Sequence, residues 1–194
     1  MKELVIATRN RGKMKEIEAF LAGLVERVTC AADFEAFPET VEDGATFEAN
    51  ALKKAREAMK FTGLPALADD SGLVVDALDG RPGVYSARFA GEGADDAANN
   101  RTLLHELAGV SPERRQAAFV CALAFISPEG EEKVFYGRVG GCILAEARGE
   151  GGFGYDPLFL VDGFGRTMAE LSVDEKNRIS HRGQALRQFR EYLE

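Results

Sequence analysis

Residues 67–76 read Leu67-Ala68-Asp69-Asp70-Ser71-Gly72-Leu73-Val74-Val75-Asp76, and the rest of the chain is organised around this stretch. An apolar approach leads into two adjacent acids, a hydroxyl and a glycine, and a second apolar run follows. We expect a strand that delivers Asp69 and Asp70 to a turn. Adjacent carboxylates repel each other and are costly near a core unless a cation or a proton offsets them, which favours a functional site. Asp, Ser and Gly are also ordinary turn formers, so a purely structural turn remains an alternative.

Length and composition predict a protein with a substantial core and no membrane span. With 194 residues and 45% hydrophobic content, the chain fits a single catalytic domain, residues 1–194, with two lobes. The apolar stretches are too short to cross a membrane, and the N-terminus enters a strand pattern without a signal peptide. The three scattered cysteines indicate reduced thiols and a cytoplasmic location. The net charge of −8 argues against nucleic acid as a partner but allows a small anionic substrate.

The N-terminal segment has the layout of an anion site. A strand over residues 3–7 leads into a polar loop, Thr8 to Lys13, and a helix is expected from about 13 to 24. Thr8, Asn10 and Lys13 offer a hydroxyl, an amide and a cation next to a helix N-terminus, which suits phosphate. The loop is not a Walker A motif, because the first glycine is missing and Met14 follows the lysine. A helix cap with solvated arginines is the alternative.

The remaining pattern alternates strands and helices early and adds a hairpin late, which predicts an α/β fold with a mixed sheet. Helices are expected at about 47–60, 95–108 and 184–193, and strands at 26–30, 116–126, 133–139, 142–144 and 158–161. We expect Gly140-Gly141 to break the strand that precedes them. The charged residues on the outer face of the helix at 47–60 are expected to be solvated, and they are Lys53, Lys54, Arg56 and Lys60.

Two later segments offer groups for a planar, charged ligand. The glycine-rich stretch 149–157 contains Phe153 and Tyr155, either of which could stack on a base, and the alternative is that these aromatics fill the core. Ser172 and Glu175 match a capping box, and a basic segment from Lys176 to Arg182 follows. A solvated basic turn is the alternative there.

Together these segments indicate nucleoside triphosphate chemistry. Glu42, Asp69 and Asp70 offer the hard oxygen ligands that Mg²⁺ prefers. No Cys or Ser lies in a recognisable nucleophile motif, so a water molecule is the simplest nucleophile.

At this point the sequence resembles the Ham1-type inosine triphosphate pyrophosphatases, nearly from end to end. Six segments in order carry the resemblance: Thr8-Arg9-Asn10-Arg11-Gly12-Lys13, Glu42-Asp43-Gly44-Ala45-Thr46-Phe47 with Asn50-Ala51, Ala68-Asp69-Asp70-Ser71-Gly72-Leu73, Pro82-Gly83-Val84-Tyr85-Ser86-Ala87-Arg88, Phe153-Gly154-Tyr155-Asp156-Pro157 and Ser180-His181-Arg182. The resemblance implies an inosine triphosphatase-like α/β fold, a mixed twisted sheet flanked by helices with two lobes around a central cleft, and a homodimer. It also implies Mg²⁺-dependent hydrolysis of ITP, dITP and XTP to the monophosphate and pyrophosphate.

The resemblance also implies roles for individual residues. Thr8, Asn10 and Lys13 would bind the triphosphate. Glu42 and Asp70 would hold Mg²⁺, with Asp70 acting on the water, Asp69 supporting it and Ser71 contacting the substrate. Phe153 would stack on the purine, and its edge would be read by Asp156, Lys176, His181 and Arg182. Gly154 and Tyr155 would also bind the substrate. Asp43 follows Glu42 where a neutral residue is common in the family, which leaves open which carboxylate takes the metal.

Two other functions remain in competition with this one. A related pyrophosphatase could act on other modified nucleotides or on pyrimidine nucleotides. A nucleotide-binding module without turnover is also possible, although binding alone would not need the three acids Glu42, Asp69 and Asp70.

Overall fold

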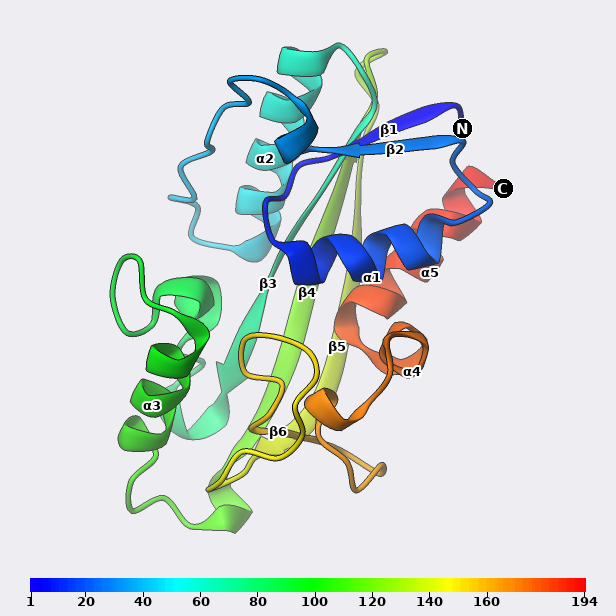
Figure 1. Cartoon of the computed structure of the whole chain (residues 1–194). Helices are drawn as coiled ribbons and strands as arrows, with labels where there is room; N and C mark the ends of the chain where they lie inside the picture. Colours follow the sequence, from blue (N-terminus) through cyan, green and yellow to red (C-terminus); the bar gives the residue numbers. More distant parts are fainter. The chain divides into compact units, whose positions relative to one another are not determined.

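The computed structural model describes residues 1–194, and its strands form a single mixed sheet in the order β2-β1-β3-β4-β5-β6 (Figure 1). β1 pairs in parallel with β2 and β3, whereas β5 pairs antiparallel with β6. The sheet is therefore mixed and the fold is α/β, as the alternation of strands and helices predicted. The strands are β1 (Glu3–Ile6), β2 (Arg27–Cys30), β3 (Ala66–Val75), β4 (Gln116–Ile126), β5 (Glu132–Ile143) and β6 (Phe159–Val161).

The helices begin where side-chain caps are available. Asn10 accepts a hydrogen bond from the backbone of Lys13, Thr46 caps the second helix, and Ser172 with Glu175 forms the predicted capping box. The helices are α1 (Arg11–Leu21), α2 (Phe47–Thr62), α3 (Asp96–Glu106), α4 (Val173–Ile179) and α5 (His181–Leu193). The last helix thus begins three residues before the expected Gln184, and none of the helices is long and apolar enough to cross a membrane.

The chain divides into two compact units. The first unit contains residues 1–70, 121–137 and 182–194, and the second contains residues 71–120 and 138–181. Each unit has a core of its own.

In the first unit, the alternation of side chains along the strands supplies two separate apolar faces. Leu4, Ile6 and Leu67 belong to the cluster that also contains residues of α1 and α5, which lie side by side in Figure 1. Val5 and Ala68 belong to the cluster packed with α2. Successive residues of a strand point to opposite faces, so α1 and α5 cover one face and α2 covers the other.

In the second unit, α3 and the segments before and after β6 pack against the portions of β3, β4 and β5 that belong to this unit. Leu103 and Leu107 of α3 are fully buried and share one cluster with Leu73, Phe119 and Phe159. The rings of Phe119 and Phe159 lie 4.6 Å apart between centroids. Aromatic pairs at such separations add to the stabilisation from burial alone.

Two sequence-based expectations about strand ends are wrong. β3 runs without interruption through Asp69, Asp70 and Ser71, so the acids lie inside a strand and not at a turn. The parallel register with β1 covers Ala66 and Leu67, and β4 is the other neighbour of β3, so strand pairing supports an extended backbone where the local composition favours a turn.

β5 likewise continues through Gly140 and Gly141. A Cβ atom on Gly141 would lie 2.3 Å from the carbonyl oxygen of Leu160 and 2.7 Å from the ring of Phe159. Glycine is needed here because β6 approaches closely, and not because the strand ends.

Candidate functional site

The two adjacent acids of β3 face opposite sides of the sheet. Asp69 follows the alternation of Leu67, whose side chain packs with α1 and α5, and Asp70 follows that of Ala68, whose side chain packs with α2. Both carboxylates are buried. The repulsion expected between neighbouring acids is thereby reduced, and the two acids have different hydrogen-bond and ion-pair partners.

Asp69 belongs to a buried network of two acids and two bases. Its Oδ2 atom lies 3.0 Å from Lys13 Nζ and 3.0 Å from Arg182 Nη2. Arg182 also donates a hydrogen bond to Glu16. Burial raises the pKa of Asp69, but the charges of Lys13, Arg182 and Lys54 outweigh it, so that the pKa lies well below its usual value. Asp69 is therefore ionised at neutral pH, and its charge holds Lys13 and Arg182 in place.

Asp70 has a weaker set of partners. Asn50 Nδ2 donates to Asp70 Oδ2 over 2.9 Å, and Lys54 Nζ lies 3.7 Å from Asp70 Oδ1. Burial raises the pKa of Asp70, Lys54 and Lys13 lower it, and Glu42 raises it again, with a net upward shift. A carboxylate with a raised pKa accepts a proton more readily than an ordinary one, which is the property of a general base.

Lys54 links Asp70 to Glu42. Its ammonium group lies 2.8 Å from Glu42 Oε1, and the lysine is buried. Burial lowers the pKa of Lys54, but the charges of Asp70, Glu42 and Asp69 raise it by more than burial lowers it. The group therefore remains an ammonium ion. The carboxylates of Glu42 and Asp70 thus converge on one cation.

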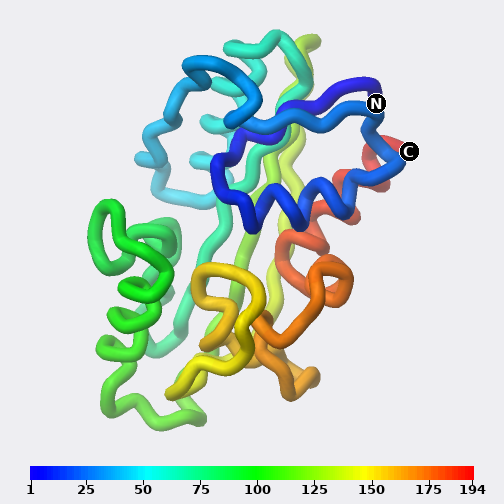
Figure 2. Tube along the Cα trace, viewed as in Figure 1, coloured from blue at the N-terminus to red at the C-terminus, as the bar shows by residue number.

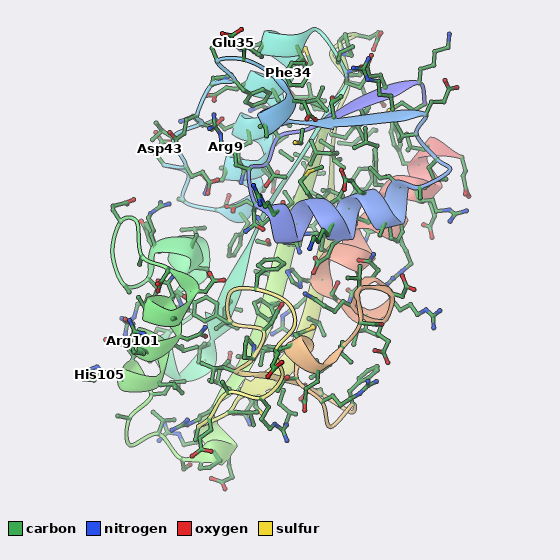
Figure 3. The ribbon with its side chains drawn as sticks, in the orientation of Figure 1. Arg9, Phe34, Glu35, Asp43, Arg101 and His105 are labelled. Atoms are coloured by element: carbon green, nitrogen blue, oxygen red, sulfur yellow. The ribbon has the colours of Figure 1, made fainter.

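The segment that carries Glu42 is tied to α2. Lys53 Nζ lies 2.7 Å from Asp43 Oδ1, and Asn50 Oδ1 accepts from the backbone N–H of Gly44 over 2.8 Å. Asp43 is 68% exposed and extends outward (Figure 3), whereas Glu42 reaches Lys54. Of the two neighbouring acids, Glu42 is therefore the one that joins the Asp70 cluster.

The loop before α1 brings its three predicted phosphate ligands into one turn. Thr8 Oγ1 accepts from the backbone N–H of Asn10 over 3.2 Å, and Asn10 Oδ1 accepts from that of Lys13 over 3.0 Å. Both side chains thus order the loop, Thr8 through a local turn and Asn10 as the N-cap of α1. Lys13, at the start of α1, reaches the buried Asp69.

A second cluster lies in the second unit, between α4 and the loop from β5 to β6 that is traced in yellow in Figure 2. Asp156 Oδ2 accepts from the backbone N–H of Phe153 over 2.9 Å and lies 2.8 Å from Lys176 Nζ. The same ammonium group lies 5.0 Å from the centroid of the Phe153 ring. Phe153, Asp156 and Lys176 therefore form one group with a half-buried aromatic ring at its edge.

The other residues that were predicted to read the base or to bind the substrate have different surroundings. Tyr155 is buried in the core and donates from its hydroxyl to the carbonyl of Ser86 over 2.8 Å, as in the alternative of an aromatic that fills the core. His181 stacks on Phe119 at 5.0 Å between centroids. Ser71 and Gly154 are half-buried. Arg182, although it follows His181 in sequence, binds the carboxylates of the first unit.

Three buried polar residues were not identified as site residues from the sequence. The prediction that Lys54 is solvated is wrong, and Glu16 and Asn50 were given no role. Asn50 and Lys54 are one turn apart on α2, beside the buried alanines 51, 55 and 58. The sequence pattern that could have identified Asn50 and Lys54 was a polar pair beside a helix face of small residues. For Glu16, the corresponding pattern was its position next to Ile17 on the inner face of α1.

In this α/β fold, the strand β3 carries two buried acids that pair with lysines of α1 and α2, an arrangement typical of proteins that bind charged ligands. Within that class, the chain belongs to the Ham1 family, which matches residues 4–192.

Named relatives and solved structures agree with this membership over the full length. A "dITP/XTP pyrophosphatase" of Geobacter sulfurreducens is 58% identical, with 100% of this chain and 97% of the relative covered. The structure of a HAM1 protein from Coxiella burnetii superposes with a TM-score of 0.88 at 44% identity, covering 100% of this chain and 98% of that one. The Staphylococcus aureus Ham1 protein gives a TM-score of 0.86 at 41% identity, covering 99% and 98%.

Proposed function

We propose that this protein is a pyrophosphatase that hydrolyses non-canonical purine nucleoside triphosphates, namely ITP, dITP and XTP, to the monophosphate and pyrophosphate. The observation that carries the proposal is the buried cluster of the first unit, in which Asp70, Glu42 and Lys54 meet and the neighbouring Asp69 pairs with Lys13 of the loop at residues 8–13. Relatives named dITP/XTP pyrophosphatase support the choice of substrate.

In this proposal the first unit binds the triphosphate and activates the water. Thr8, Asn10 and Lys13 bind phosphate oxygens, and Lys13 supplies a positive charge held by Asp69. Asp70 orients the attacking water and accepts its proton, for which a raised pKa is suited. Positioning and charge neutralisation carry most of such a phosphoryl displacement, so no covalent intermediate is required.

Mg²⁺ is the cofactor that the family implies, and the donor set fits it. The structure contains no group of three or more His, Cys, Asp or Glu side chains that could hold a metal ion by itself. Mg²⁺ is usually held by one or two carboxylates together with substrate phosphates, and Glu42 and Asp70 already converge on the ammonium group of Lys54. We assign Glu42 and Asp70 as its protein ligands. When bound, the ion would offset the charge of the phosphates.

The second unit is proposed to recognise the base. Phe153 stacks on the purine, and Lys176 and His181 donate hydrogen bonds to the 6-oxo group that inosine and xanthine carry in place of the amino group of adenine. A donor left unpaired against adenine costs about 1–3 kcal/mol, so two donors could give strong discrimination. Asp156, Gly154, Tyr155 and Ser71 shape this region. Arg182 acts through Asp69, because carboxylates already occupy its guanidinium group.

The test is pyrophosphate release from ITP, dITP, XTP, GTP and ATP, each with Mg²⁺ and with EDTA. We expect fast, metal-dependent release from ITP, dITP and XTP and little from ATP or GTP. Release mainly from a pyrimidine or another modified nucleotide would keep the phosphate and metal assignments but reject the base assignment. Binding without release from any nucleotide would indicate a sensor.

Replacing the proposed base tests the role of Asp70. We expect Asp70→Asn to retain ITP binding, measured by calorimetry, and to reduce turnover by about 100-fold or more, as loss of a general base does. Asp79→Asn is the matched control, because it makes the same change at an exposed position whose left-handed backbone suits asparagine. Near-normal turnover of Asp70→Asn would remove Asp70 from the mechanism.

We further propose that the protein works as a homodimer in the cytoplasm. Cys30, Cys121 and Cys142 all carry free thiols, which is consistent with a reducing compartment. Light scattering after gel filtration would determine the oligomeric state, and a monomer at micromolar concentration would reject the dimer.

A further inference from the structure

Gly154, next to the proposed stacking residue Phe153, is held at both of its backbone polar groups by one helix. Its N–H donates to Asp96 Oδ2 over 2.7 Å, and its C=O accepts from Asn100 Nδ2 over 2.9 Å. Asp96 and Asn100 are four residues apart, so they lie on the same face of α3, one turn from each other. Gly154 has a φ of +60°, a conformation that favours glycine. The helix therefore restrains the backbone of Gly154 from outside the loop, in addition to the hydrogen bonds that the loop makes within itself.

The two peptide groups that flank the Phe153 side chain are both held by carboxylates. Asp156 accepts from the N–H of Phe153 itself, and Asp96 accepts from the N–H of the next residue. Hydrogen bonds to ionised acceptors are about twice as strong as neutral ones. The direction in which the Phe153 ring leaves the backbone is thus determined from both sides, once by its own loop and once by α3.

α3 is itself anchored well enough to act as a fixed support. Asn99 donates to the carbonyl of Ala87 over 3.1 Å and accepts from the N–H of Ala90 over 2.8 Å. Leu103 and Leu107 are fully buried in the core of the second unit. Neighbouring asparagines on one helix thus serve different purposes: Asn99 ties α3 to residues 87–90, and Asn100 ties it to the glycine-rich loop.

We infer that Asp96 and Asn100 of α3 are positioning residues that set the orientation of Phe153 and thereby the base selectivity of the site. This inference rests on the proposed function for its consequence in catalysis, but its structural part concerns only the second unit. Neither residue needs to touch the substrate. Their effect is on substrate affinity and on discrimination between bases, and not on the water attack assigned to the first unit.

Asp96→Ala tests the inference against Asp96→Asn. Alanine removes the acceptor for the Gly154 N–H, whereas the amide oxygen of asparagine can still accept from it. We expect Asp96→Ala to raise KM for ITP about tenfold, as loss of a hydrogen bond to a charged group does, with kcat changed less than about twofold. The preference for ITP over ATP should fall with it, and Asp96→Asn should restore most of both. Arg101→Ala is the control on α3, since Arg101 is exposed and extends away from the helix (Figure 3).

A spectroscopic reporter tests the structural part without any substrate. The chain has no tryptophan, so Phe153→Trp gives a single fluorophore at the position of interest. Asp96→Ala in that background should shift the emission maximum, and Arg101→Ala should not. An unchanged emission, or an equal loss of kcat in Asp96→Ala and Asp96→Asn with KM unaltered, would overturn the inference. If the parent protein hydrolyses no nucleotide, the proposed function fails, but the emission still decides whether Asp96 positions residue 153.

Asn100→Ala covers the case in which Asp96→Ala does not fold. Asn100 Oδ1 makes no hydrogen bond in the structure, so alanine removes only the bond from Nδ2 to Gly154. Alanine is also the residue that favours a helix most. We expect the same emission shift and the same rise in KM, smaller in size because the lost bond is neutral. A variant that matches its parent in both measurements would overturn the role of Asn100.

Discussion

Arg182 holds two buried carboxylates, those of Glu16 and Asp69, and its own side chain is only 2% exposed. Burial lowers the pKa of Arg182, but Asp69 and Glu16 raise it beyond its usual value. A buried ion pair of this kind contributes little net stability compared with apolar residues, yet breaking it is costly because the partners stay buried without a counter-charge. Its purpose is better understood as fixing Asp69, and through Asp69 the side chain of Lys13.

We therefore predict that Arg182→Met destabilises the protein by about 3–5 kcal/mol, the usual cost of removing one partner of a buried pair. Urea unfolding followed by circular dichroism measures the loss. Arg190→Met is the control, because Arg190 is half exposed and pairs only with Glu194 at the chain end; it should cost less than about 1 kcal/mol. Similar losses in the two variants would mean that the buried network does not constrain the fold.

At the scale of single elements, the pairing of β5 with β6 depends on one of two adjacent glycines. Gly141 pairs with Val161, and a Cβ there would overlap the backbone of Leu160. A Cβ on Gly140 would meet chiefly Asp162 Oδ2, at 2.8 Å, which is the end of a side chain that can move aside. Neither glycine has the left-handed backbone that would make alanine strained in itself. The two positions therefore differ in space alone.

We predict that Gly141→Ala destabilises the protein by about 1–3 kcal/mol, as overpacking does, and that Gly140→Ala costs much less. Thermal unfolding of the two variants beside the parent makes the comparison. Equal midpoints for both variants would mean that β6 can move away from β5 at no cost, and the close approach would then not explain the glycine.

At the scale of the whole molecule, features that depend on one element were predictable from the sequence. Features that depend on contacts with elements distant in sequence were not. Thr46 at the start of α2 and the capping box at Ser172 followed from local chemistry. The continuity of β3 through Asp69 and Asp70 did not, because it comes from strands that are distant in sequence. The same holds for Lys54, whose burial depends on the acids that surround it.

The predicted ligands show the same division. The motifs identified Asp69, Asp70 and Glu42 as a group. The alternation of side chains along β3 then decides their partners, because successive residues point to opposite faces of the sheet. Asp69 meets Lys13 and Arg182, and Asp70 meets Asn50 and Lys54. The same alternation predicts opposite faces from the sequence alone once residues 66–75 are treated as one continuous strand. A turn at Asp69 would have given no prediction of the face on which either acid lies.

Acid stability depends on all the carboxylates together, and in this protein most of the carboxylates with a shifted pKa have it lowered. The pKa is lowered for Asp43, Asp69, Glu113, Glu129, Glu132, Glu170 and Glu175. A group whose folded pKa lies below its unfolded value stabilises the fold above the unfolded pKa and loses that contribution as the pH falls through the folded one. Asp70, with its raised pKa, has the opposite sign and is relieved by protonation.

We therefore predict that the melting temperature, in buffer with EDTA, falls as the pH is lowered from about 5 to about 2. Glu175 is the most direct probe, since hydrogen bonds from Arg166 and from the backbone of Ser172 lower its pKa from 4.5 to about 2. Glu175→Gln should flatten the fall between these two pH values, because glutamine can still accept in the capping box but no longer titrates. Glu18→Gln, at an exposed position of α1, should leave the slope unchanged. Parallel curves for the parent and Glu175→Gln would mean that the α4 cap does not contribute to acid unfolding, and that the decline arises at the other carboxylates whose pKa is lowered, Asp69 among them.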